Sequence, residues 1–104
     1  MPEFDQAVAA ALEQVMRDIP EAKPGKMFGM PAYKLNGKLV VGMYQDKVVA
    51  KLGAKRAQAL IGKPGIQPCE IQGGLWKDWV MLTGDLARQR TVIEEAVRYV
   101  AENS

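Results

Sequence analysis

The dipeptide Asn36-Gly37, set between two extended apolar runs, constrains the fold of this chain more than any other feature. Asn-Gly accepts the positive φ angles of a two-residue type I′ turn better than almost any other pair, so we predict a β-hairpin centred on it. The stretch from Lys26 to Leu52 predicts three short strands joined by two tight turns, the second at Gln45-Asp46. Apolar side chains on both faces of the middle strand are typical of a central strand with cover on both sides.

Helices are predicted at both ends of the chain and after this meander. At the N-terminus, spacings of three and four place five apolar residues on one helical face, and Pro20 is expected to end the helix: Phe4, Val8, Leu12, Val15 and Ile19. A short helix is predicted over 54–61, with a stop at Gly62. The last helix is expected to follow Thr83 or Asp85 as its N-cap and to bury Leu86, Ile93, Val97 and Val100.

Two more strands, 66–71 and 76–82, complete the predicted order α-β-β-β-α-β-β-α. Pro68 restricts the first of them to the edge of the sheet, because proline donates no ladder hydrogen bond. The end helices need a surface to cover, which predicts one antiparallel five-stranded sheet packed against them. With 104 residues and no repeat or linker, the chain is expected to be a single α+β domain over 1–104.

Cysteine and histidine usage excludes much of enzyme chemistry. The chain has one cysteine, Cys69, and no histidine, so Ser-His-Asp and Cys-His machinery and His-based zinc sites are excluded. Cys69 lies in an apolar-flanked strand and is expected to be a buried, inert thiol. We therefore expect a non-enzyme without catalytic residues, metal or cofactor. The start MPEFDQAV has no export signal, and no apolar run approaches the ~20 residues of a membrane helix, which favours a cytoplasmic location.

Charge is segregated along the chain. Residues 1–21 carry one basic and five acidic side chains, residues 22–77 ten and two, and residues 78–104 three and five. A basic sheet region between acidic end helices favours an acidic protein partner or phosphate backbones, although lysines also protect strand edges from aggregation. The candidate interaction surface comprises Lys26, Lys34, Lys38, Lys51, Lys55, Arg56 and Trp76.

Aromatic and methionine side chains are the other candidates. Strand alternation predicts that Trp76 and Trp79 fall on opposite faces, one in the core and the other marking an interface, such as that of a homodimer. Phe28 and the methionines are expected to pack in the core, although a Met-lined groove also accepts varied partners: Met27, Met30, Met43 and Met81. An alternative is a small-ligand pocket lined by Met27, Tyr33 and Trp79.

The order KMFGMPAYKLNGKL, VVAKLGAKRAQALIG and GGLWKDWVML resembles the N-terminal domain of the TfoX/Sxy family, and YjbR-like domains are similar in plan. The motif positions are Met27, Phe28, Gly29, Gly37, Lys51 and Trp79. The resemblance implies a fold like the secretion-chaperone-like α+β class and no catalytic residue. Full-length members look like regulators of natural competence with a further C-terminal helical domain, which is not expected in a chain that stops at Ser104.

The residues and the resemblance together predict a non-enzymatic cytoplasmic domain that acts through protein contact, with a role in gene regulation implied by the family alone. The basic sheet region is its candidate surface. Direct nucleic-acid binding through the same region is the second hypothesis. A small-ligand binder or an enzyme of unknown type is the third.

Overall fold

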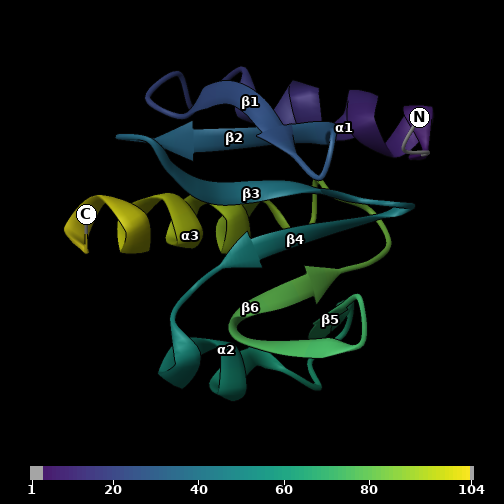
Figure 1. Cartoon of the computed structure of the whole chain (residues 1–104), viewed down its shortest axis with the longest axis vertical. Coiled ribbons are helices and arrows are strands. Elements are labelled where there is room, and N and C mark those ends of the chain that lie inside the picture. The colour runs from purple at the N-terminus through teal and green to yellow at the C-terminus, as the bar shows by residue number, and fades with distance from the viewer. Residues whose placement is uncertain (1–3, 104) are drawn as a thin grey trace.

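A computed structural model describes residues 4–103, whose elements follow the order α-β-β-β-β-α-β-β-α (Figure 1). They are α1 (Gln6–Met16), β1 (Lys23–Met27), β2 (Met30–Leu35), β3 (Lys38–Tyr44), β4 (Lys47–Lys51), α2 (Ala54–Leu60), β5 (Ile66–Ile71), β6 (Gly74–Leu82) and α3 (Arg90–Glu102). The α+β class is confirmed. The sheet, however, has six strands in place of the predicted five.

The additional strand is β1, because the stretch predicted to hold three strands contains a third tight turn. Met27 pairs with Met30, and Phe28 and Gly29 between them have φ angles of 52° and 76°. Both central residues of a type I′ turn need such angles, but a bulky aromatic residue rarely adopts one. Phe28 therefore gives no turn signal, and the sequence does not predict β1.

All neighbouring strands are antiparallel, in the order β1-β2-β3-β4-β6-β5. The predicted Asn36-Gly37 turn is confirmed, with φ angles of 53° and 81°. The strand that contains Val41 is central, as predicted, and Pro68 lies in the edge strand β5. These placements follow from local chemistry: an Asn-Gly pair fits the turn, and an edge tolerates the missing donor of proline.

One face of the sheet is covered by helices. In Figure 1, α1 and α3 lie behind the strands, and α3 crosses β3 and β4. The larger hydrophobic core lies between these layers and includes Leu12 of α1, Met43 of β3 and Ile93 of α3, all almost completely buried. The helix α2 adds Ala57 and Leu60 to the same core. The amphipathic end helices thus bury their apolar faces against the sheet, as their spacing predicts.

The ends of the two long helices differ from the predicted ones. Asp5 caps α1 by accepting hydrogen bonds from the amides of Ala7 and Val8 at 2.8 and 3.1 Å. That helix ends at Met16, before Pro20, and Ile19 reaches the core from the turn that follows. Neither predicted cap begins α3, because Asp85 caps only a separate turn before it, and α3 starts at Arg90.

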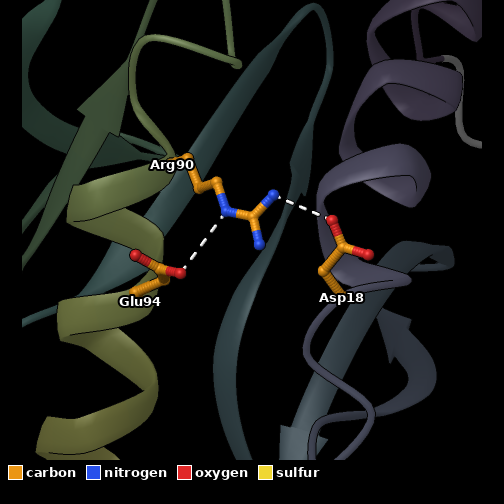
Figure 2. A network of polar contacts seen from close by, with 3 residues as sticks. All are labelled: Asp18, Arg90 and Glu94. Atoms are coloured by element: carbon orange, nitrogen blue, oxygen red, sulfur yellow. Dashed lines mark hydrogen bonds and ion pairs between the residues drawn. The ribbon is translucent and has the colours of Figure 1, made fainter.

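Arg90 ties the first and last helical regions together. Its guanidinium donates to the carboxylate of Asp18 at 2.8 Å and to that of Glu94 at 3.4 Å (Figure 2). These two hydrogen bonds raise the pKa of Arg90. Exposed ion pairs of this kind contribute little to the free energy of folding. The network links the turn after α1, which contains Asp18, to the start of α3.

Within residues 4–103, none of the helices is both long enough and apolar enough to cross a lipid bilayer.

Candidate functional site

The face of the sheet opposite α1 and α3 carries a second hydrophobic cluster, which is built from strands alone. We call this side of the sheet the open face, because every residue of its cluster comes from a strand. The buried members are Met27, Ala32, Val49, Cys69, Ile71, Trp79 and Met81, with Leu39, Tyr44 and Trp76 partly buried against them. The predicted cover on both sides of β3 therefore exists, but on the open face strand side chains supply it.

Four aromatic rings run in a row across the open face. The centroid of the Phe28 ring lies 6.3 Å from that of Tyr44 and 6.0 Å from that of Trp76, and the two tryptophan rings are 5.5 Å apart. The Tyr44 and Trp79 contacts are edge-to-face, a favoured geometry for aromatic pairs. This aromatic row, Tyr44-Phe28-Trp76-Trp79, joins the strands β3 and β6 and the β1–β2 turn.

Phe28 is the most unusual member of the row. It is 45% exposed, although the sequence predicted core packing for it, and its φ of 52° belongs to the left-handed region. A non-glycine residue held there costs about 1–3 kcal/mol, and such strain clusters at functional sites. The turn thus holds an aromatic ring at the surface in a strained conformation that asparagine or glycine would adopt more easily.

The two tryptophans share one face, so the prediction that they lie on opposite faces is wrong. In the β5–β6 pair, Val80 faces Pro68 and Leu75 faces Glu70, so residues 76–79 of β6 lie opposite the single residue Cys69. Extra residues in one strand bend it and interrupt strict alternation. Trp79 is only 8% exposed and Trp76 is half-buried, which confirms that one tryptophan is in the core.

Four lysines lie on the open face according to the strand register. Residues directly opposite one another in an antiparallel pair share a face: Lys34 pairs with Leu39 and with Lys23, Lys51 with Trp79 and Lys47 with Tyr44. The aliphatic stem of Lys34 also lies over Gly25, since a Cβ added there would be 3.4 Å from its Cε. Lys47 pairs with Asp46 at 3.4 Å, whereas Lys34 and Lys51 make no ion pair within residues 4–103.

The described strands contain two acidic side chains, Glu70 and Asp78. Glu70 lies between Cys69 and Ile71, which both belong to the cluster, so alternation places it on the other side. Asp78 lies in the part of β6 where strict alternation is interrupted, and it makes no ion pair with Lys34 or Lys51. The open face therefore combines an apolar centre with two lysines that no acidic side chain of the described residues neutralises.

The seven predicted surface residues do not form one patch. Lys34, Lys51 and Trp76 come together on the open face. Lys38 pairs with Leu35 of the helix-covered core, and Lys26 alternates with Met27, so both belong to the other side of their strands. The remaining two, Lys55 and Arg56, lie on α2, where Arg56 is bound to Glu95 of α3 at 2.8 Å.

The motif positions behind the family resemblance are less dispersed. Met27, Phe28, Lys51 and Trp79 all lie on the open face or at its rim. Gly29 completes the turn that holds Phe28, and Gly37 completes the Asn36-Gly37 turn. The predicted surface did not include Tyr44, the first ring of the aromatic row, although an aromatic residue next to the Gln45-Asp46 turn was an available signal.

The hypothetical ligand pocket lined by Met27, Tyr33 and Trp79 does not form. Met27 and Trp79 are buried in the strand cluster, while Tyr33 packs against the helix-covered core and lines a groove with Glu13 and Arg17. Burial, and next the charge of Glu13, raises the pKa of Tyr33. No group of three or more potential metal ligands occurs in the described part of the chain.

Cys69 is completely buried, as predicted, and its burial raises the pKa of the thiol from 9.0 to about 11. The unfolded chain releases this proton near its ordinary pKa, so the thiol's contribution to stability is full below pH 9 and is lost as the pH rises to 11. Between these values we expect Cys69 to lower the free energy of unfolding by about 1.4 kcal/mol per pH unit.

Urea unfolding at pH 8 and pH 10, on the wild type and on Cys69→Ala, checks this expectation. The variant keeps every tyrosine and lysine, so the difference between the two pH slopes isolates the thiol. Equal slopes would contradict the raised pKa.

Comparison of the chain with protein-family models, with curated proteins and with solved structures gave no match. The resemblance to the TfoX/Sxy N-terminal domain therefore stays a prediction. The function is inferred from the chemistry of the open face.

Proposed function

We propose that this chain is a non-enzymatic protein-interaction domain that binds its partner through the open face. The observation that carries the proposal is Phe28, an aromatic side chain held 45% exposed by a strained turn and packed between the rings of Tyr44 and Trp76. Aromatic side chains near the centre of an interface supply much of its binding energy. Half-buried Trp76, whose ring centroid lies 6.0 Å from that of Phe28, extends the apolar surface around it.

The arrangement of the rings favours a protein over a nucleic acid. Strands that bind single-stranded nucleic acids offer free ring faces to successive bases along a basic groove. Here the rings pack against one another at interplanar angles of 70°, 44° and 65°, which covers part of those faces. The basic groups are also divided between the open face and α2, so they do not follow one continuous track.

The family resemblance supports the same surface and adds a process. Its motif positions Met27, Phe28, Lys51 and Trp79 lie at the open face, and none of them carries a catalytic group. We propose accordingly that the domain acts in regulation, by contact with another protein, as the TfoX/Sxy resemblance implies.

A photo-crosslinking residue placed at Lys47, which faces Tyr44 of the aromatic row, tests the proposal in the host cell. We expect a discrete protein adduct from this position, and none from the same residue placed at Arg98, which is exposed on α3 on the helix-covered side. Adducts from position 98 alone, or adducts to nucleic acid, would contradict the proposal.

Replacing Phe28 by asparagine separates binding from folding. Asparagine accepts the positive φ, so the relief of about 1–3 kcal/mol of strain offsets the lost ring contacts of about 0.5–1.5 kcal/mol each. We expect the free energy of unfolding in urea to stay within about 1 kcal/mol of the wild type, while the adduct from position 47 disappears. An undiminished adduct would remove Phe28 from the interface.

A further inference from the structure

The two ends of the open face differ in charge, and this difference indicates the chemistry of its partner. Phe28 and Tyr44 lie at one end of the strands, where β1 ends and β3 ends. Lys34 and Lys51 lie at the other end, beside Leu39 and Trp79 respectively. The aromatic row runs from the first end to Trp79 at the second. At the first end Lys47 is paired with Asp46 beside the aromatic rings, whereas Lys34 and Lys51 at the second end make no ion pair within the described residues.

We propose, as a deepening of the function above and resting on it, that the open face binds an extended acidic segment of another protein. In that segment an apolar side chain packs on Phe28 and two carboxylates meet Lys34 and Lys51. Charge complementarity carries this choice, since neither lysine has a counter-ion within the described residues, and alternation places Glu70 on the other side of the sheet.

The register sets the spacing within such a segment. Leu39 lies on β3, between the strands that carry Lys34 and Lys51. It is five residues from Tyr44 along β3, which corresponds to about 17 Å. The lysines lie on β2 and β4, two strand spacings or about 10 Å apart, and their flexible side chains reach inward. Carboxylates at alternate positions of an extended chain are about 7 Å apart. The segment is thus an acidic pair separated by about three to six residues from an aromatic or aliphatic residue.

A second copy of this chain is a poorer occupant. Pairing two open faces would bring Lys34, Lys47 and Lys51 of one copy toward the same residues of the other. Like charges placed opposite one another at an interface are costly. An acidic partner avoids this repulsion, and its carboxylates are attracted to the same lysines.

Selection of phage-displayed random 12-residue peptides on the whole immobilised chain tests the inference. We expect the enriched peptides to carry an apolar residue and an acidic pair at the stated spacing. Both tryptophans of the chain lie on the open face, so their fluorescence reports binding of a synthetic copy of each peptide.

Charge reversal identifies the contacts. We expect the double variant Lys34→Glu/Lys51→Glu to weaken binding of the selected peptide roughly tenfold or more. The matched control, Lys38→Glu/Lys63→Glu, changes net charge equally at exposed sites off the open face and should alter binding less than about twofold. Urea unfolding verifies that both double variants remain folded.

The possible failures are distinguishable. Peptides that need Phe28 but lack acidic residues, or that ignore the double reversal, would overturn the acidic segment and leave the proposed function standing. Selection that yields no peptide sensitive to Phe28→Asn would overturn both. Binding of a 20-nucleotide oligo(dT) that outcompetes the peptide, with a steep salt dependence, would overturn both in favour of nucleic acid. A dimer in sedimentation that Lys34→Glu/Lys51→Glu strengthens would replace the acidic partner by a second copy.

Discussion

Replacement of Gly53 by alanine is expected to lower the free energy of unfolding by about 2–4 kcal/mol. Gly53 joins β4 to α2 with a φ of 85°, and its amide donates to the carbonyl of Asp78 at 3.0 Å. A Cβ there would lie 2.6 Å from Cε1 of the Tyr99 ring on α3. The substitution therefore adds a steric clash to the cost of a left-handed alanine. Urea unfolding of the purified chain measures the loss.

Gly37→Ala is the matched control for Gly53→Ala. Gly37 has nearly the same φ, 81°, but no atom lies within 4 Å of an added Cβ. We expect it to cost about 1–2 kcal/mol, the price of the backbone conformation alone. Removing the ring in Gly53→Ala/Tyr99→Ala should recover the steric part, as a double-mutant cycle would show. Equal losses for Gly53→Ala and Gly37→Ala would contradict the close approach of Tyr99.

Truncation of Ile93 to alanine is the second large effect, with an expected loss of about 2–5 kcal/mol. Ile93 is 0% exposed and lies where α3 packs on the central strands. The loss combines the transfer of its methyl groups from the core with the cavity that they leave, which the tightly packed neighbours fill only in part. The shift of the denaturant midpoint at constant slope measures it.

Leu75→Ala serves as the comparison for Ile93→Ala. Leu75 is 53% exposed, so its truncation should change the free energy of unfolding by no more than about 0.5 kcal/mol. A loss as large as that of Ile93→Ala would mean that Leu75 packs in the core, contrary to its exposed position.

The parts of the fold that the sequence predicted are those set by local chemistry. Asn36-Gly37 forms the turn that its residue types favour, Pro68 lies at an edge, and Gly62 takes a φ of 101° after α2. Asp5 is a residue type that favours the N-cap position, and the prediction from apolar spacing did not use it. In each case one or two neighbouring residues carry the information.

The candidate site depended on features that no local pattern reports. The Phe28-Gly29 turn uses an aromatic residue where asparagine is usual, which hid β1. Alternation failed at Trp76 and Trp79 because β6 carries extra residues opposite Cys69. The charge count located a basic region along the chain, but only the register separates Lys34 and Lys51 from Lys26 and Lys38 on the other side of the strands.

The packing of α1 and α3 on one side of the sheet also determines how the domain can be tethered. These helices are the first and last elements of the described chain, and Arg90 holds the region after α1 beside α3. Both lie behind the strands when the sheet is viewed as in Figure 1. A linker, fluorophore or solid support joined through either helix would leave Phe28 pointing outward. A neighbouring domain on either side of this one in a longer polypeptide could likewise leave the partner's approach unobstructed.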